Sequence, residues 1–484
     1  MAKSKGNNRL STNTFRIFRI GGYVSFLLLM IFDYFLYQLD VLPSKYLFLL
    51  LIVTLLVELF AIGAILFFKK PLKIAGFVVV IIFGLFSGIG IYYGYHANSF
   101  LNDSFRNSKL NSSATYYIIV PNDSNISSIN DIDSTLSYLS GTYLIDQALT
   151  SFQEKKNIQM TSYDDALTMF QDLKSHLILG ALVDQTSYQL ILEMKNEFVE
   201  SDFKVIDSFE VQMEVENDTI SNSSDKFQVY IGGNDFTNSL MDFNMIVTIN
   251  TKSHRILFTS IPRDYYIPVF GYDGRRDTLS FMGARGIEVN RRSLADFLGV
   301  DLNYFMKLET KSLVGIVDQV GGITYCSDRS FTTTHATILD TYDDSKGNKL
   351  DVKKGCQKLN GIEALTVARE RLAFPGGDRQ RQKNCQQIIM AIFKQLISTN
   401  TITNYNNILS SLSDLYQTNI PREIITDLIK ETIAGAEWDI ENQSMDGSDS
   451  NNFVHLSNLR SYVMIPNPDS VEEAKIKMKD ILDS

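Results

Sequence analysis

The chain has 484 residues, of which 45% are hydrophobic, so it is long and apolar enough for two or three domains with buried cores. Its formal net charge is −10, which argues against a nucleic-acid-binding protein, because such proteins usually present a basic face. The absence of C-x-x-C and G-x-S-x-G motifs leaves little support for a zinc site or a hydrolase triad.

Three apolar runs near the start have the length of membrane-spanning helices, about 20 residues each. They are Ile20–Leu39, Tyr46–Phe68 and Ile74–Tyr93. Basic residues lie before the first run and between the second and third, at Lys3, Lys5, Arg9, Arg16, Arg19, Lys69, Lys70 and Lys73. The positive-inside rule therefore predicts a multi-pass cell-membrane protein with a cytoplasmic tail over residues 1–14, three transmembrane helices over residues 15–95, and the rest of the chain outside.

Residues 96–115 are rich in serine and asparagine and are expected to form a stalk. Residues 116–213 then alternate short apolar segments with amphipathic ones, which is typical of a small α/β accessory domain. Strands are expected at Tyr116–Val120 and Leu177–Val183, and helices at Ile132–Leu139, Tyr163–Leu173 and Tyr188–Phe198. No convergent set of polar residues in this region indicates a catalytic site.

A polar linker is expected over residues 214–226 and a larger domain over residues 227–484. Strands are expected at Phe227–Ile231, Asn244–Ile249, Arg255–Ile261 and Ile323–Tyr325, helices at Arg291–Leu298 and Lys311–Val320, and a mostly helical segment after Asn400. The second and third strands form a predicted hairpin. The mixed order of strands and helices predicts a three-layer α/β/α domain.

Positive charge gathers in the segment Gly361–Ile389, against the sign of the whole chain. In an extended segment, Arg369 and Arg371 would point to one face, because side chains alternate along a strand. Pro375-Gly376-Gly377 then breaks the chain, and Asp378 is a natural N-cap for a helix. Since a helix N-terminus favours anions, the segment predicts an anion site. A solvated surface with local arginine–carboxylate pairs is the alternative.

Two aspartates flank neighbouring strands of the larger domain. Asp235 lies just after the first strand, and Asp242 lies just before the second. Carboxylates at neighbouring strand ends can share a magnesium ion, which takes oxygen ligands and bridges to phosphate oxygens. Solvated or capping aspartates are the alternative interpretation.

Three cysteines, Cys326, Cys356 and Cys385, fall in the part of the chain expected outside the membrane, where disulfides persist. A Cys326–Cys356 bridge and free buried thiols are the two alternatives, because the sequence does not fix the pairing.

Several motifs between Phe227 and Ser398 occur in a characteristic order: YIGGND, MDFNMIVTIN, TSIPRD, LVGIVDQVGGITY, LNGIEALTVARER and GGDRQRQKN. In these motifs the chain resembles the LytR–CpsA–Psr (LCP) family. The layout of three spans, an accessory domain and then this domain resembles the capsular polysaccharide (CpsA) branch of streptococcal-type bacteria. The resemblance implies a membrane-anchored phosphotransferase that moves a glycopolymer from a polyprenyl-pyrophosphate carrier onto peptidoglycan outside the membrane.

The resemblance also implies roles for individual residues. Asp235 and Asp242 would hold a magnesium or manganese ion. The pyrophosphate would be bound by Arg263, Arg369, Arg371 and Arg381, with Arg276 adding positive charge. The expected catalytic residues are Arg263, Asp264, Arg369 and Arg371, with Asp264 as a candidate base for the acceptor hydroxyl. Asp378, Asn384 and Cys385 would support the site. Fixed arginines and a metal ion would stabilise the charge that develops on the leaving group.

The chain departs from the family pattern at three places, one of which is a shorter spacing between Asp235 and Asp242 than in capsule relatives. Asp277–Gly283 reads DTLSFMG where the family commonly has D-K-L-x-H-A-G, so Thr278 and Phe281 replace a lysine and a histidine. Cys385 stands where a glutamine is usual. These departures keep open a non-catalytic polyprenyl-pyrophosphate binder or capsule-assembly regulator or scaffold as the alternative. Expected partners are the lipid-linked polysaccharide, peptidoglycan, membrane lipid and other capsule-assembly proteins, with no nucleic acid.

Overall fold

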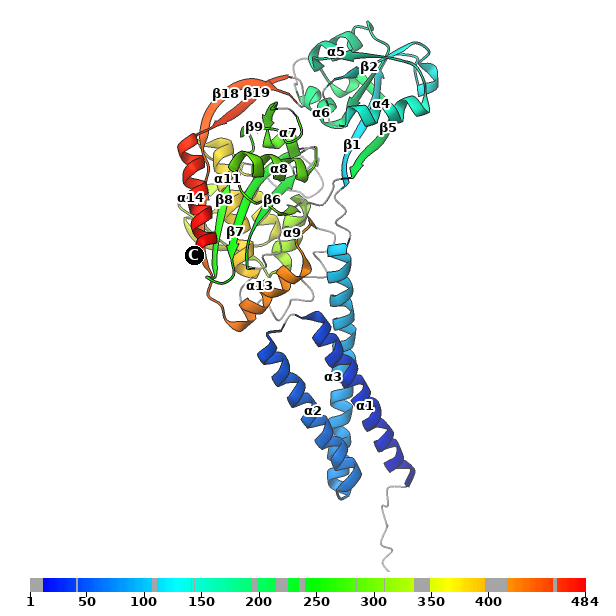
Figure 1. Cartoon of the computed structure of the whole chain (residues 1–484), viewed down its shortest axis with the longest axis vertical. Helices are drawn as coiled ribbons and strands as arrows, with labels where there is room; N and C mark the ends of the chain where they lie inside the picture. The colour runs from blue at the N-terminus through cyan, green and yellow to red at the C-terminus, as the bar shows by residue number, and fades with distance from the viewer. Residues whose placement is uncertain are drawn as a thin grey trace, which may run out of the picture. The chain divides into compact units, whose positions relative to one another are not determined.

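The computed structural model describes residues 12–40, 42–106, 111–140, 142, 144–193, 198–214, 225–234, 240–272, 274–283, 285–308, 310–334, 349–396, 416–455 and 459–484. The chain divides into two compact units. The first comprises Met1–Phe105, Ile397–Ser413 and Pro421–Ala436, and the second comprises Arg106–Leu396, Asp414–Ile420 and Glu437–Ser484. Figure 1 labels the elements of both units.

The first unit contains three long apolar helices, α1 (Thr12–Leu39), α2 (Ser44–Phe67) and α3 (Lys70–Arg106). Each is long and apolar enough, by length and composition, to cross a membrane, as predicted for these three segments. The stalk predicted over residues 96–115 contains the end of α3, which continues to Arg106, and the beginning of β1. Residues 96–106 contain neither glycine nor proline, so nothing in the sequence stops the helix at the end of its apolar stretch.

Close backbone contacts join the helices of this unit. A Cβ built on Gly76 of α3 would lie 2.7 Å from the carbonyl oxygen of Ala61 in α2, so the two helices meet where a side chain would not fit. The unit also includes α13 (Arg422–Ala434), whose Lys430 forms an ion pair of 2.7 Å with Asp40, the residue that follows α1.

The accessory domain in the second unit is built on a five-stranded sheet in the order β3-β2-β4-β1-β5. Its elements are β1 (Asn111–Pro121), β2 (Thr135–Leu139), α4 (Ile145–Lys155), β3 (Gln159–Tyr163), α5 (Ala166–Lys174), β4 (Ala181–Asp184), α6 (Gln185–Glu193) and β5 (Phe203–Glu214). The helix predicted at Ile132–Leu139 is wrong, because its second half is β2. This strand pairs with β3 and β4, and the tertiary pairing outweighs the local helical pattern.

A six-stranded mixed sheet in the order β16-β11-β6-β7-β8-β17 forms the centre of the larger domain. Its strands are β6 (Lys226–Asn234), β7 (Met241–Asn250), β8 (Arg255–Ser260), β11 (Tyr304–Leu308), β16 (Tyr416–Thr418) and β17 (Asp439–Ser444). The predicted hairpin is confirmed as the antiparallel pair β7–β8. The mostly helical segment predicted after Asn400 is wrong in part, because β16 and β17 complete the two sheet edges.

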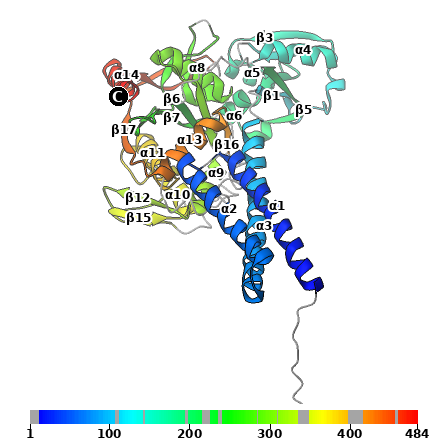
Figure 2. The ribbon, with the colours of Figure 1, turned by 60° about the horizontal axis from the view of Figure 1, so that its bottom comes forward.

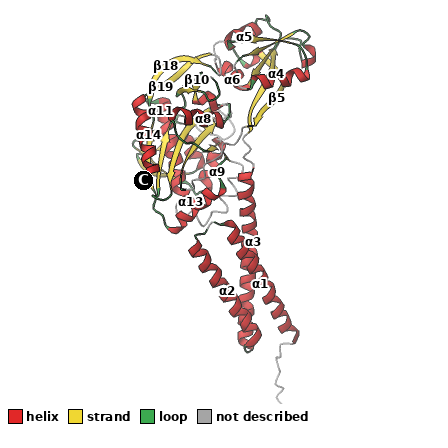
Figure 3. Cartoon of the chain, viewed as in Figure 1, coloured by secondary structure: helices red, strands yellow, loops and turns green. Residues whose placement is uncertain are grey.

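Helices cover both faces of this sheet, which confirms the three-layer expectation (Figure 3). Successive residues of β8 face opposite ways. Leu257 belongs to the core cluster that includes residues of α8 (Ile287–Leu298) and α14 (Pro468–Asp483). Phe258 instead contacts Phe393 of α11 (Gly377–Leu396), with ring centroids 5.5 Å apart.

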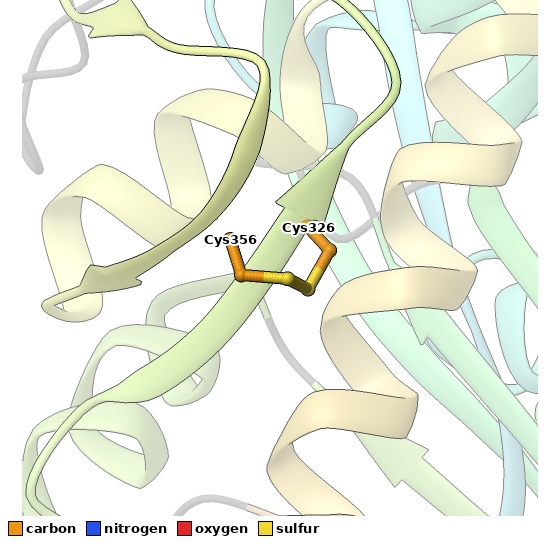
Figure 4. Close-up of a disulfide and its surroundings, with 2 residues drawn as sticks. All are labelled: Cys326 and Cys356. Carbon is orange, nitrogen blue, oxygen red and sulfur yellow. A yellow bond between two sulfur atoms is a disulfide. The ribbon is translucent and has the colours of Figure 1, made fainter.

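A disulfide joins Cys326 and Cys356 (Figure 4). The two residues lie directly opposite each other in the antiparallel pair β12 (Ile323–Ser327) and β15 (Gly355–Leu359). Figure 2 shows this pair near α10 (Gly361–Arg369) and α11. The structure therefore selects the disulfide over two free thiols, and it braces the strand that leads into α10.

The remaining short elements are β9 (Tyr266–Pro268), β10 (Arg276–Thr278), α7 (Leu279–Gly283), α9 (Thr310–Gln319), β13 (Phe331–Thr332), β14 (Asp351–Val352), and the hairpin β18 (Gly447–Val454) and β19 (Leu459–Pro466). The helices predicted at Arg291–Leu298 and Lys311–Val320 are confirmed as α8 and α9. The strand predicted at Ile323–Tyr325 is also confirmed, because it forms the first three residues of β12, which pairs with β15.

Candidate active site

One carboxylate of the predicted set lies between two arginines. Asp242 is the second residue of β7, Arg263 follows the end of β8, and Arg381 lies in the second turn of α11. Arg263 Nη1 donates to Asp242 Oδ1 at 2.5 Å, and Arg381 Nη1 donates to Asp242 Oδ2 at 3.3 Å. Three segments that are far apart in the sequence therefore meet at Asp242.

The electrostatic surroundings of Asp242 are strongly positive. Burial acts to raise the pKa of the Asp242 carboxyl, but the charges of Arg381, Arg263 and Arg369 outweigh it and hold the pKa below its ordinary value. The side chain of Asp242 is 29% exposed, so the site is open to solvent. Three arginines around one partly buried carboxylate leave positive charge available for an anionic ligand.

The backbone around Arg263 is fixed on both sides. Its carbonyl oxygen accepts a hydrogen bond from Ser280 N at 2.8 Å, and the carbonyl of Asp264 accepts one from Met464 N at 2.7 Å. Asp264 Oδ2 lies 3.6 Å from Arg263 Nε. The structure therefore places the candidate base beside the arginine of the same motif.

Arg369 and Arg371 do not lie in an extended segment, and this prediction is wrong. Asn360 and Glu363 form a capping box that begins α10, which then continues to Arg369 as its last residue. Arg369 is partly buried and acts on Asp242 through its charge, whereas Arg371 is exposed. The apolar residues between Gly361 and Ala368 follow a helical pattern that outweighs strand alternation.

Glu370, between the two arginines, is a residue that the sequence reasoning did not assign to the site. It is 1% exposed and accepts hydrogen bonds from Thr334 N at 2.6 Å and from Ala373 N at 2.8 Å. Burial acts to raise its pKa, but these hydrogen bonds outweigh it and lower the pKa. Glu370 thus anchors the turn between Arg369 and Arg371, and its position inside R-E-R was the available signal.

Asn384 and Cys385 support the end of α10 from α11. Asn384 is fully buried, and its Nδ2 donates to the carbonyl of Val367 at 3.3 Å. The Cys385 thiol donates to the carbonyl of Ala368 at 3.1 Å. These carbonyls belong to the last turn of α10, where that of Val367 also accepts from the Glu370 amide at 3.2 Å, so Asn384 and Cys385 add support to the segment that carries Arg369.

Asp378 is not the N-cap that the sequence predicts. The helix α11 begins at Gly377, so Asp378 is its second residue. The helix thus starts two residues earlier than an N-cap at Asp378 implies, at Gly377, whose positive φ of 49° is a left-handed conformation that glycine allows.

Arg276 is placed differently from the other predicted arginines. It is exposed in β10, and its described hydrogen bond goes from Nη1 to the carbonyl of Tyr266 at 3.5 Å. None of its described contacts reaches Asp242, Arg263 or Arg381. Asp235, the other predicted metal ligand, lies outside the described residues.

A comparison with protein families identifies the domain. The model of the LytR_cpsA_psr family matches residues 188–480, which is more than half of the chain. The chain belongs to the LytR_cpsA_psr family. The match contains all the residues of the LCP site described above, from Asp242 to Arg381, and confirms the resemblance seen in the motifs.

Two relatives are similar to this chain over part of its length. The polyisoprenyl-teichoic acid–peptidoglycan teichoic acid transferase TagU of Bacillus anthracis is 30% identical over 190 residues, which cover 39% of this chain and 58% of that protein. Biofilm regulatory protein A of Streptococcus mutans is 28% identical over 187 residues, which cover 37% of this chain and 44% of that protein. The chain thus spans little more than half of the length of TagU.

Solved structures show a partial likeness. The crystal structure of protein gbs0355 from Streptococcus agalactiae is 27% identical with a TM-score of 0.45, and the likeness covers 54% of this chain and 89% of that one. The crystal structure of B. subtilis TagV is 22% identical with a TM-score of 0.45, covering 54% of this chain and 98% of that one.

Proposed function

We propose that this LCP protein transfers capsular or another cell-wall glycopolymer from a polyprenyl-pyrophosphate carrier to peptidoglycan. The observation that supports this function best is the contact of Arg263 and Arg381 with one partly exposed carboxylate, Asp242, within reach of the charge of Arg369. A pyrophosphate is the kind of compact, multiply charged anion that such an arginine group binds.

The reaction would be an attack by an acceptor hydroxyl on the phosphorus that carries the polymer. The bond from that phosphorus to the bridging oxygen breaks, and polyprenyl phosphate leaves. Arg263 and Arg381 would stabilise the negative charge that grows on the leaving oxygen, because they are already held in place before the reaction. Asp264 is the proposed base that accepts the hydroxyl proton.

Magnesium is part of the proposal through the chemistry of its donors. Asp242 supplies one carboxylate in the described part of the chain, and within that part no group of three histidine, cysteine or acidic residues gathers. Magnesium often binds through one or two carboxylates, waters and substrate phosphates, so Asp242 together with Asp235 fits this pattern. A bound magnesium ion would neutralise charge on the pyrophosphate.

The proposed location of the site is outside the membrane. Basic residues flank the cytoplasmic ends of the spans, and Asp40 lies in the poorly charged first loop. The Lys430–Asp40 ion pair supports this topology, because it joins that loop to α13 in the C-terminal half of the chain. The Cys326–Cys356 disulfide also suits a compartment outside the cytoplasm.

A second candidate is a polyprenyl-pyrophosphate binder that does not turn over. Thr278 and Phe281 favour it, because they stand where the family commonly has a lysine and a histidine. Thr278 Oγ1 accepts a hydrogen bond from Phe281 N at 3.3 Å, so it serves the backbone of α7. This candidate would keep the arginine group and lose the chemistry.

The experiment is a transfer assay with the full chain in lipid nanodiscs. It contains magnesium, a lipid-linked oligosaccharide and peptidoglycan fragments, and mass spectrometry detects the joined product and the released polyprenyl phosphate. We expect both products from the wild type. Tight binding of the lipid with neither product would overturn the transferase proposal and favour the binder.

A further inference from the structure

The short helix α7 rests against both strand ends that carry the central ion pair. Ser280 N donates to the carbonyl of Arg263 at 2.8 Å. A Cβ built on Gly283 would lie 2.2 Å from the Cβ of Met241, so the helix packs directly on the residue before Asp242. A displacement of α7 would therefore move the backbone of Arg263 and of Asp242 together.

An apolar cluster shared by the accessory domain and the β18–β19 hairpin lies against α7. Phe281 packs against an apolar cluster that includes Tyr188 and Ile191 of α6. The histidine that the family commonly has at this position would place a polar ring in that cluster. The two departures in DTLSFMG thus have a structural role here, since Thr278 caps α7 and Phe281 docks it.

A buried ion pair fixes the same junction. Arg285 N donates to the carbonyl of Met282 at 2.9 Å, which ties Arg285 to the end of α7. Its guanidinium contacts Asp184 at 2.9 Å, and each of the two side chains is 2% exposed. Asp184 Oδ1 also accepts a hydrogen bond from Ser187 N at 3.1 Å in the first turn of α6. One carboxylate therefore caps α6 and pairs with the arginine behind α7.

The β18–β19 hairpin makes a second connection between the two domains (Figure 1). Val454 and Val463 belong to the same apolar cluster as α6. At the other end of the hairpin, Asp449 pairs with Arg379 of α11 at 2.9 Å. The apolar end of the hairpin therefore gives the accessory domain a second contact with the larger domain, apart from α7.

We propose that the accessory domain, Asn111–Glu214, is a positioning part of the transferase site. It holds α7 in place, and α7 sets the distance between Asp242 and Arg263 that the pyrophosphate requires. The residues that act are Arg285, Asp184 and Phe281, none of which touches the reacting atoms. The kinetic test of this inference rests on the proposed function. The structural test does not, because it follows the backbone contacts of α7.

The test compares three variants of the full chain in nanodiscs. Arg285→Met breaks the buried pair, and Phe281→Ala removes the apolar contact without leaving a buried charge. Lys174→Met is the matched control, because it removes a surface ion pair within the accessory domain, Lys174–Asp202, at 2.7 Å. We expect kcat and kcat/KM to fall together by about 10-fold in the first two variants and to stay unchanged in the control.

Hydrogen–deuterium exchange supplies a readout that needs no activity. We expect amides in Met241–Asn244 and around Ser280 to exchange about 10-fold faster in Arg285→Met and Phe281→Ala than in Lys174→Met. Unchanged exchange and unchanged kcat in a folded Phe281→Ala protein would overturn the inference, even if Arg285→Met does not fold. A wild type that transfers nothing defeats the proposed function, while the exchange data still decide the coupling.

Discussion

Two of the arginine–aspartate sites among the described residues differ in access and in balance. Arg285 and Asp184 form one pair, with each side chain 2% exposed. Asp242 is 29% exposed and receives both Arg263 and Arg381. In the buried pair one positive charge balances one negative charge. At Asp242 the positive charges of the arginines exceed the single negative charge, and solvent access allows an anion to take over some of their contacts. Solvent access and surplus charge, more than the presence of an ion pair, therefore distinguish the ligand site from the structural site.

The largest effect should come from the closed pair. Arg285→Met leaves Asp184 buried without its counter-charge, so we expect the free energy of unfolding to fall by about 3–5 kcal/mol. Chemical denaturation followed by the fluorescence of Trp438, the single tryptophan, measures the change. The double variant Arg285→Met/Asp184→Leu should recover part of the loss, because it removes the buried charge as well. If the free energy of unfolding of Arg285→Met falls by less than about 1 kcal/mol, the buried pair contributes no more to stability than a surface ion pair, and the contrast with the Asp242 site is contradicted.

The open site should respond in rate more than in stability. Arg263→Ala removes one preorganised donor, so we expect the transfer rate to fall about 100- to 1000-fold. Arg379→Ala is the control, because Arg379 lies on the same helix as Arg381 but pairs with Asp449. The transfer assay described above measures both. Equal losses of transfer rate in the two variants would show that the total positive charge, and not the contact of Arg263 with Asp242, determines the rate.

The disulfide should stabilise the strand pair that leads to the Asp242 site. Cys326→Ser/Cys356→Ser releases the strand pair that leads into α10, whose last residue is Arg369. We expect the free energy of unfolding to fall by roughly 2–4 kcal/mol. Denaturation with and without a reductant gives the value, and the double variant should be insensitive to the reductant. Sensitivity that persists in the variant would contradict the assignment of the effect to this bond.

Protonation should weaken the open site at low pH only. The pKa of Asp242 is held below its ordinary value, so its ion pairs contribute stability above about pH 4 and lose it as pH falls through the folded-state pKa. We expect Asp242→Asn to cost about 1–2 kcal/mol at pH 7. The difference from wild type should narrow as the pH is lowered below about 4. Denaturation at a series of pH values measures it, and a constant difference would show that charge is not involved.

The smallest effect is expected at Cys385. Its thiol is a weak donor to the carbonyl of Ala368, so Cys385→Ala should change the transfer rate by less than about 3-fold. Asn384→Ala is the comparison, because Asn384 is fully buried and holds the same end of α10. If Cys385→Ala lowers the transfer rate as much as Asn384→Ala does, the side chain at position 385, where the family usually has a glutamine, contributes to the site.

Motif order was sufficient to predict the LCP domain and the meeting of Asp242, Arg263 and Arg381. These residues lie at strand ends or in a helix start, where local sequence largely sets position. The three membrane helices and the β7–β8 hairpin were also predictable, because hydrophobic length and alternation are local signals.

Other features depended on tertiary contacts. Arg369 ends a helix because the capping box at Asn360 starts one, and strand alternation gave the wrong local picture. The helix predicted over β2 failed because pairing with β3 and β4 is not visible locally. The role of Phe281 could not be inferred either, since the apolar cluster that it meets comes from the accessory domain and from the β18–β19 hairpin, both far from it in the chain.

The most direct test of the central claim is a single-turnover assay of the full chain with a fluorescent lipid-linked oligosaccharide and peptidoglycan fragments. The account predicts release of polyprenyl phosphate together with labelled peptidoglycan in the wild type and in Arg379→Ala, and loss of both in Arg263→Ala and Arg381→Ala. Equal product from Arg263→Ala and wild type would contradict the claim that the arginine group around Asp242 performs the transfer.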